Sequence, residues 1–451
     1  MPADTWITEA AAQRRLQSLL MPVHPSDRLT ATEWFSRIEP SRYAPSSNVE
    51  AQALPFQRWY KFKEAFSPRF VSSAIGSLDR RPKMCVDPFG GSGTTALTCQ
   101  FLGVHPTTIE VNPFLGDLIE AKLCKYNVGE LVRSYAHVLK TYLGIRPTLR
   151  DLLKSAPPTF VEPGVDGRWI FNRPIAKKLM ALRTAISELD NEAHQRLFRI
   201  LLGSIAVKLS NVVISGKGRR YRSGWEEREE KADAVERAFR EIAERAIEDI
   251  TRFGRRAESK YTLLRGDSRK LVKNAPEAEF SLFSPPYPNS FDYTDIYNVE
   301  LWLLGYLNSP ADNKGLRQAT LRSHVQVKRS YEGEPRESKL LKKTIKALER
   351  KSEDLWDNDI PDMVRAYFDD MATIMHGLSA TMARKADVMM VIGDSRYAGV
   401  RVDVATICSE MAPALGFKVV SSHPIRAMRA SAQQGGHHVL SEALLHLRKT
   451  R

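Results

Sequence analysis

Short apolar runs alternate with amphipathic stretches near both ends of the chain, and this pattern predicts an α/β fold. Strand, glycine-rich turn, helix, strand and acidic residue follow one another between residues 83 and 110, as at the start of a doubly wound parallel sheet. Strands are predicted at 83–86, 107–109, 261–264, 280–283, 386–392, 416–420 and 443–447, and helices at 70–78, 96–102, 363–383 and 402–414.

The sheet pattern stops between residues 126 and 256, where the periodicity is mostly helical. One charged helix there carries a single apolar stripe, which is typical of packing surface, formed by Val235, Phe239, Ile242, Ala246 and Ile250. Ahead of it, 215–224 is predicted to be a flexible basic loop. We divide the chain into an N-terminal arm (1–55), a first core segment (56–127), a helical insertion (128–256) and a second core segment (257–451) with a basic insertion at about 306–356.

The net charge of +14 indicates a polyanionic partner, of which nucleic acid is the commonest. The four cysteines lie far apart in the sequence, so neither a disulfide framework nor a metal site is expected. The first 15 residues lack the apolar run of a signal peptide, and no stretch is long enough to cross a bilayer. We therefore expect a cytoplasmic, nucleoid-associated protein with no membrane partner.

The turn Asp87-Pro-Phe-Gly-Gly-Ser-Gly-Thr-Thr95 follows the first predicted strand. Its three glycines remove side chains where a ligand would approach the backbone. Glu110, at the end of the next strand, has the right position to accept hydrogen bonds from both hydroxyls of a ribose. A dinucleotide-binding enzyme would share these two features, but it would not usually begin the turn with Asp-Pro-Phe.

A second motif, Ser284-Pro-Pro-Tyr287, stands at the end of another predicted strand. Two prolines fix φ and remove backbone donors, which leaves carbonyls that can only accept. Hydrogen bonds from a base amine to the Ser284 hydroxyl and the Pro285 carbonyl would free the nitrogen lone pair for attack. Tyr287 offers a flat face on which an extruded base can stack. Pro286 completes this predicted catalytic tetrapeptide.

Together the two motifs resemble those of the DNA amino-methyltransferases, which methylate N4 of cytosine or N6 of adenine. The resemblance covers roughly residues 56 to 127 and 257 to 450. It implies S-adenosylmethionine (SAM) as cofactor and the Rossmann-like SAM-dependent methyltransferase fold, a mostly parallel seven-stranded sheet with one reversed strand. Asp267 would accept from the adenine amine of SAM. The cofactor-binding residues that it implies are Phe66, Ser67, Asp87, Pro88, Phe89, Gly90, Gly91, Gly93, Thr94, Glu110, Asn112, Asp267 and Ser268.

Serine at position 284 is commoner in the N4-cytosine branch, so cytosine is favoured over adenine. A C5-cytosine enzyme would need a cysteine where this chain has Tyr287. The chain departs from many relatives of this type because the cofactor motif comes first and about 150 residues separate Glu110 from Asp267. The order leaves the chemistry intact, but the insertion leaves open which segment reads the target.

Two other functions remain. An RNA guanine-N2 methyltransferase would share both motifs, although such enzymes usually carry an RNA-binding module where this chain has about 50 residues. A catalytically silent subunit that binds SAM or DNA is disfavoured by two intact motifs. Double-stranded DNA is the expected partner, with a cognate restriction endonuclease as a further candidate. The predicted contacts to DNA are Lys217, Arg219, Arg220, Arg222, Arg322, Lys328 and Arg329.

Overall fold

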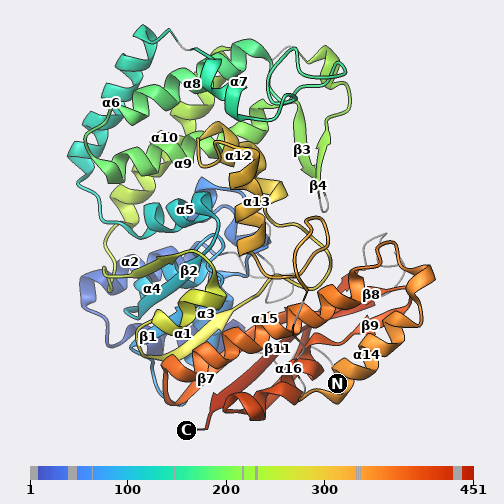
Figure 1. Ribbon diagram of the computed structural model, residues 1–451. Helices are drawn as coiled ribbons and strands as arrows, with labels where there is room; N and C mark the ends of the chain where they lie inside the picture. The colour runs from blue at the N-terminus through green and yellow to red at the C-terminus, as the bar shows by residue number, and fades with distance from the viewer. Residues whose placement is uncertain are drawn as a thin grey trace.

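The computed structural model describes residues 9–38, 48–62, 64–146, 148–215, 218–228, 232–331, 333, 335, 337–429 and 439–450. Seven strands form one sheet in the order β10-β11-β7-β6-β1-β2-β5 (Figure 1). Only β11 runs antiparallel to its neighbours within this sheet. The strands are β1 (Met84–Asp87), β2 (His105–Glu110), β5 (Thr262–Arg265), β6 (Ala278–Phe283), β7 (Met382–Gly393), β10 (Phe417–Arg429) and β11 (Val439–Lys449).

The predicted fold class is confirmed, because the sheet is mostly parallel, has seven strands and contains one reversed strand. Both of its faces are buried, as expected for parallel strands covered by helices on each side. Leu282 of β6 packs into one apolar core, whereas the next residue, Phe283, packs into the other. Met389 and Met390 of β7 divide in the same way.

Helices cover the two faces of the sheet. On the first face lie α3 (Pro68–Gly76), α4 (Thr94–Leu102) and α5 (Pro113–Leu123). On the second lie α11 (Ser268–Leu271), α14 (Lys339–Glu349), α15 (Ile360–Thr381) and α16 (Val404–Met411). A small hairpin, β8 (Ser395–Tyr397) with β9 (Val400–Val402), extends beyond the end of β7 near α14 (Figure 1). The sheet therefore lies between two layers of helices, and these layers leave the ends of its strands uncovered.

The insertion predicted at 128–256 is a helical lobe on the α5 side of the sheet (Figure 1). All five residues of the predicted apolar stripe are buried, and they lie on α10 (Asp233–Phe253). Helix α9 (Glu192–Leu209) packs against α5 and, with α12 (Asn298–Leu303) and α13 (Pro310–Ala319) nearby, joins the lobe to the core. The helices of the lobe are α6 (Val128–Gly144), α7 (Arg150–Ser155), α8 (Arg173–Ser187), α9 (Glu192–Leu209) and α10 (Asp233–Phe253).

The sequence predicts a flexible loop at 215–224, but residues 215 and 218–221 belong to a β-hairpin. Strand β3 (Val212–Ser215) pairs antiparallel with β4 (Gly218–Tyr221). The β-branched run Val212-Val-Ile214 favours a strand, and it supplies the apolar partner for a basic strand that would not pair alone. The hairpin projects from the helical lobe toward the second core segment (Figure 1).

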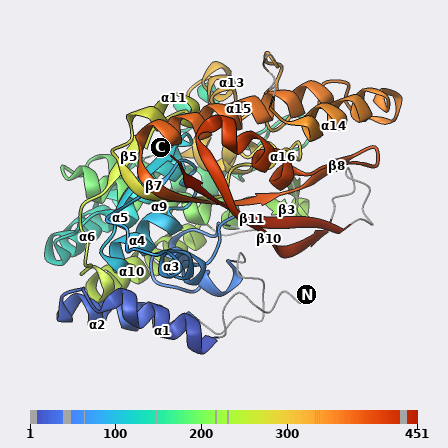
Figure 2. The same ribbon diagram turned by 90° about the horizontal axis from the view of Figure 1, so that it is seen from below.

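The described part of the predicted N-terminal arm forms α1 (Glu9–Leu20) and α2 (Pro25–Ser36). These helices pack along the outer side of α3 and α4 (Figure 2). Trp34 is fully buried, and its ring stacks on Phe101 of α4 at 4.3 Å between centroids. Its indole Nε1 donates to the carbonyl of Pro55 at 3.2 Å. This segment is therefore part of the core packing.

Candidate active site

The glycine-rich turn and the Ser-Pro-Pro-Tyr segment leave the same edge of the sheet. They follow β1 and β6, which are adjacent parallel strands with Val86 opposite Ser281. Both segments line one cavity of about 500 Å³. The predicted site residues that line it are Phe66, Asp87, Pro88, Phe89, Gly90, Gly91, Thr94, Glu110, Asn112, Asp267, Ser268, Ser284, Pro285, Pro286 and Tyr287.

The turn after β1 needs glycine for steric reasons. A Cβ on Gly90 would lie 2.3 Å from Cγ2 of Thr108 and 2.8 Å from Cδ1 of Ile119. Gly91 has φ +52° and Gly93 has φ +79°, a backbone conformation that side chains disfavour. Gly93 does not line the cavity; it is the N-cap residue that precedes α4, and it packs against Ile119. The turn therefore lies directly against β2 and α5.

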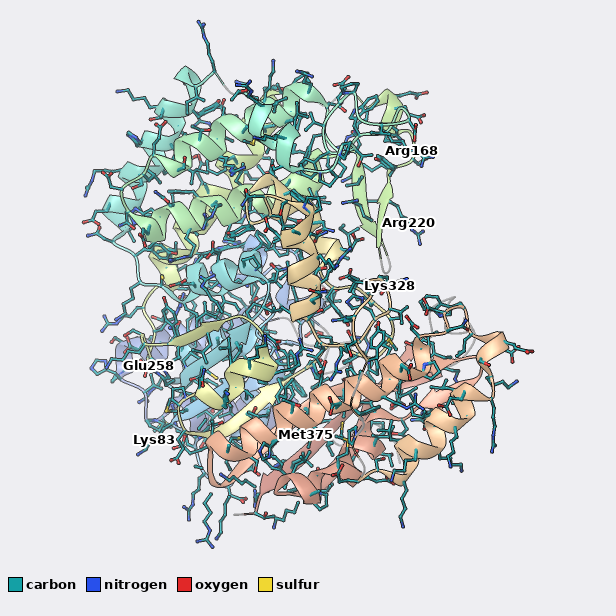
Figure 3. All side chains as sticks on the ribbon, viewed as in Figure 1. Lys83, Arg168, Arg220, Glu258, Lys328 and Met375 are labelled. Atoms are coloured by element: carbon teal, nitrogen blue, oxygen red, sulfur yellow. The ribbon has the colours of Figure 1, made fainter. Side chains whose placement is uncertain are left out.

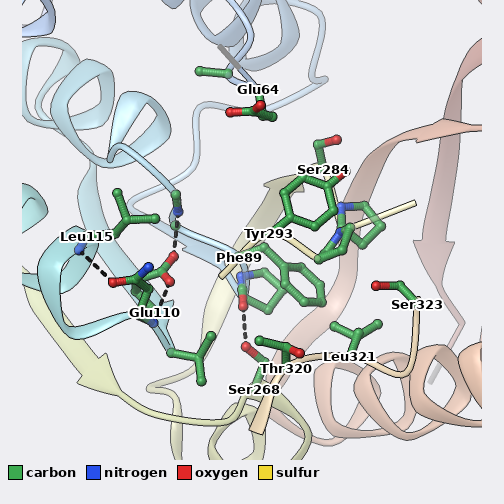
Figure 4. Close-up of a pocket in the computed structure, with 18 of the residues that line it drawn as sticks. Glu64, Phe89, Glu110, Leu115, Ser268, Ser284, Tyr293, Thr320, Leu321 and Ser323 are labelled. Atoms are coloured by element: carbon green, nitrogen blue, oxygen red, sulfur yellow. Dashed lines mark hydrogen bonds between the residues drawn. The ribbon is translucent and has the colours of Figure 1, made fainter. Parts of the chain in front are cut away.

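Glu110 connects this turn to the start of α5 (Figure 4). Its Oε2 accepts from the Gly91 amide at 2.7 Å, and its Oε1 accepts from the Asn112 amide at 2.8 Å. Burial raises the pKa of Glu110 to about 7, although these amides oppose the shift. Each oxygen keeps a lone pair for a further donor. Asn112 also caps α5, because its Oδ1 accepts from the amides of Phe114 and Leu115.

Asp87, at the end of β1, is buried beside the same turn. Its Oδ1 accepts from the Phe89 amide at 2.9 Å. Burial raises the pKa of Asp87 to about 7. Glu64 lies across the cavity from Glu110 (Figure 4), so the cavity lining contains several carboxyl groups. Arg426 is the one arginine or lysine in the described lining. The acidic wall of the cavity suits a ligand that carries positive charge.

The second core segment forms the wall of the cavity beside the glycine-rich turn. Asp267 caps α11 by accepting from the Arg269 amide at 3.0 Å, and its carboxylate also pairs with the Arg269 guanidinium at 2.8 Å. The Ser268 hydroxyl donates to the carbonyl of Pro88, which ties this segment to the glycine-rich turn (Figure 4). Ser67 is buried and caps α3 without lining the cavity, whereas its neighbour Phe66 does line it.

Hydrogen bonds join the tetrapeptide to β11. The Tyr287 hydroxyl donates to Oε1 of Glu442 at 2.8 Å. The Ser284 hydroxyl donates to the Tyr287 oxygen at 3.4 Å. Burial, and then the charge of Glu442, hold the pKa of Tyr287 well above its usual value, so the phenol stays protonated. Because a carboxylate only accepts, the direction of both bonds is fixed and the Ser284 oxygen keeps its lone pairs for another donor.

Several cavity residues were not predicted from the sequence. Tyr293 and Tyr297 follow the tetrapeptide within ten positions, and Phe62 stacks on Tyr297 with the rings 8° from parallel. The run Phe291-Asp-Tyr-Thr-Asp-Ile-Tyr297 was an available signal, because aromatic residues cluster there beside a strand end. Glu442 gave no such signal, because it lies near the other end of the chain.

The predicted DNA contacts occupy different environments, and none of the described ones lines the cavity. Arg220 and Lys328 are exposed and lie on the side where the hairpin faces the second core segment (Figure 3). Strand β4, which carries Arg219 and Arg220, packs against the short 3₁₀ helix η6 (Asp295–Tyr297) close to the tetrapeptide. Burial raises the pKa of Glu300 to about 7, and the Arg219 charge is among the influences that oppose this shift. Lys217 lies outside the described residues.

Three other predicted contacts are held by the protein itself. Arg222 donates to the carbonyls of Ser210 and Val207 at 3.0 and 2.9 Å. Arg322 forms ion pairs with Asp369 and Asp370, each at 2.7 Å. Arg329 donates to the carbonyls of Arg317 and Thr320 at 3.1 and 3.0 Å. Contact between these side chains and DNA remains a prediction, and Arg219, Arg220 and Lys328 are better placed for it.

Within the described residues, no group of three or more His, Cys, Asp or Glu side chains is arranged to hold a metal ion. The helices in the described part of the chain are too short or too polar to cross a membrane. The four cysteines are free thiols, and Cys124 alone is not fully buried.

No family model matches the chain. The chain is 26% identical over 440 residues to the Type II methyltransferase M.AvaI of Nostoc sp., covering 86% of this chain and 84% of that protein. It is 24% identical to the Type II methyltransferase M.BsoBI of Geobacillus stearothermophilus, covering 83% and 81%. Among solved structures, TrmN from Thermus thermophilus aligns with 85% of this chain and 49% of that one, at 11% identity and a TM-score of 0.29. That structural likeness is too low to support an argument.

Proposed function

We propose that this protein is a DNA methyltransferase that uses SAM to methylate an exocyclic base amine, with N4 of cytosine as the favoured target. One observation carries the proposal: the glycine-rich turn after β1 and the Ser-Pro-Pro-Tyr segment after β6 line the same cavity of about 500 Å³. The similarity to two Type II methyltransferases along more than four fifths of the chain supports the same class of reaction.

The residues at the glycine-rich turn fit the cofactor by charge. SAM carries a sulfonium and an ammonium group, and Asp87, Glu110 and Glu64 surround the cavity with carboxyl groups. Glu110 has lone pairs left after its two backbone bonds, which suits a ribose diol. A dinucleotide would instead bring an anionic pyrophosphate against Asp87 and Glu110. This charge mismatch disfavours the dinucleotide alternative.

When bound, SAM supplies an electrophilic methyl group on sulfur. The protein's part is to activate and orient the amine. Its two N–H groups would donate to the Ser284 hydroxyl oxygen and the Pro285 carbonyl, while the Tyr287 ring stacks on the base. The transfer would replace one N–H of the amine by N–CH₃, with the displaced proton passing to water and the sulfur of SAM keeping the electron pair of the broken S–C bond. Serine at position 284 is the basis for preferring cytosine.

DNA would reach the cavity from the side of the hairpin. Arg220 and Lys328 are exposed there, and β4 lies against η6, a few residues beyond the tetrapeptide. The net charge of +14 favours the phosphate backbone as a partner. We propose that the β3–β4 hairpin contacts the duplex beside the extruded base. A restriction endonuclease with the same target is a candidate partner in the cell.

The test is methyl transfer from labelled SAM to unmethylated genomic DNA, followed by digestion to nucleosides and chromatography. N4-methylcytosine is the expected product, and N6-methyladenine would move the target to adenine. Transfer to RNA guanine in preference to DNA would support the RNA enzyme instead. A Pro286→Ala protein is the matched control, because it should bind SAM but not transfer its methyl group. Binding of SAM and DNA without transfer by the wild type would indicate a silent subunit.

A further inference from the structure

Lys122 of α5 is a buried amine with no acidic partner. Its side chain is 1% exposed, and among the described residues no carboxylate lies within 4.0 Å of its nitrogen. Nζ donates to the carbonyl of Ser92 at 2.7 Å and to Oε1 of Gln57 at 3.1 Å. Ser92 lies in the glycine-rich turn, between Gly91 and Gly93.

An uncompensated buried cation destabilises a folded protein, because it gives up its hydration without an opposite charge in return. Burial accordingly lowers the pKa of Lys122 to about 7. The other buried residues of α5 are mostly apolar and include Leu118, Ile119 and Leu123. Packing alone therefore does not explain a lysine here.

The amine instead acts on the turn. Gly91 and Gly93 both have positive φ, and glycines restrict a backbone little, so the turn needs external contacts to hold one conformation. Lys122 fixes the Ser92 carbonyl from behind, while Glu110 accepts the Gly91 amide from the cavity side. Gln57 extends the support, because its Nε2 donates to the Thr94 hydroxyl at 3.4 Å.

We propose that Lys122 is a positioning residue that holds the glycine-rich turn in the conformation that receives SAM, at the expense of the stability of the free protein. This inference rests on the proposed function and assigns Lys122 no contact with SAM or base. It predicts that loss of the amine changes the stability of the free protein and its affinity for SAM in opposite directions. Removing the amine should stabilise the fold and weaken cofactor binding, whereas a residue needed only for packing would move both in the same direction.

The experiment compares wild type with Lys122→Met, which keeps an unbranched side chain without charge or donors. We expect a higher melting temperature for the free protein and a SAM dissociation constant raised about tenfold or more in calorimetry. Arg256→Met is the matched control, because Arg256 is also a buried cation but donates to Gln100 and lies over the Phe56 ring, neither of which belongs to the turn. Its SAM affinity should equal that of the wild type.

Unchanged SAM affinity in Lys122→Met would overturn the inference, and so would a Lys122→Met protein that melts earlier or does not fold. These outcomes differ from failure of the proposed function, in which the wild type itself would not bind SAM. Lys122→Gln, which keeps an uncharged donor, should fall between Met and Lys in SAM affinity if the hydrogen bond to Ser92 is the important contact.

Discussion

The hydroxyl of Tyr287 donates a 2.8 Å hydrogen bond to Glu442, a residue 155 positions further along the chain. Tyr287→Phe keeps the ring but removes this bond, so we expect a loss of about tenfold or less in the single-turnover rate. Tyr287→Ala also removes the stacking face, which is worth about 1–3 kcal/mol per base, so the rate should fall by roughly a further 5- to 150-fold. Calorimetry should show unchanged SAM affinity in both variants. Full activity in Tyr287→Ala would contradict the stacking role.

A second prediction concerns pH. Burial raises the pKa of Asp87 and Glu110 to about 7, whereas in the unfolded chain both groups ionise near about pH 4. The folded protein therefore binds more protons, and its free energy of unfolding should fall as pH rises from about 4 to about 7. A cationic ligand favours the ionised carboxylates, so SAM affinity should rise through about pH 7 and then level off.

Titration calorimetry of SAM between about pH 5.5 and 8.5 tests this prediction. Glu110→Gln should bind SAM more weakly, and its SAM affinity should rise less with pH, since Asp87 is then the only one of the two carboxyl groups that still titrates. Lys122, whose pKa burial lowers to about 7, is present in both proteins, so the difference between the two profiles isolates Glu110. Identical profiles would exclude Glu110 from the cofactor site.

Substitution of Gly90 tests the close approach of the turn to β2. The Cβ of Gly90→Ala would lie 2.3 Å from Thr108 and 2.8 Å from Ile119, so we expect a loss of about 1–3 kcal/mol in the free energy of unfolding. Gly315→Ala on α13 is the control, because no atom lies within 4 Å of its Cβ. That variant should be neutral or slightly more stable in urea unfolding. Equal stability of the two variants would show that β2 can yield at this point.

The hairpin should contribute to DNA affinity through its exposed arginine. Arg220→Ala should weaken duplex binding and reduce the slope of log affinity against log salt by about one, while SAM affinity stays unchanged. Arg384→Ala is the control: Arg384 is also exposed but lies near the start of β7, at the opposite edge of the sheet from the cavity. If both variants behave alike, the hairpin is not the contact.

The core of this fold could be predicted from local patterns. Most strands of the sheet contain a short apolar run, and the cavity forms because Asp87 ends β1 and Ser284 follows β6, which are adjacent parallel strands. The features that could not be predicted depend on contacts between residues far apart in the sequence. The loop predicted at 215–224 becomes a hairpin through pairing with Val212, and Arg322 pairs with Asp369 and Asp370, which stand almost 50 positions away. Glu442 and Lys122 acquire their roles only through contacts that no local pattern contains.

The place of β1 in the sheet has a consequence for synthesis of the chain. Its two neighbours are β2, which ends at Glu110, and β6, which ends at Phe283, with the whole helical lobe encoded between them. Until Phe283 has left the ribosome, β1 presents an unpaired edge of the kind that promotes aggregation. The lobe must therefore be synthesised before β1 can pair with β6. Pairing of β1 with β6, and with it the formation of the cavity, therefore comes late in the synthesis of the chain.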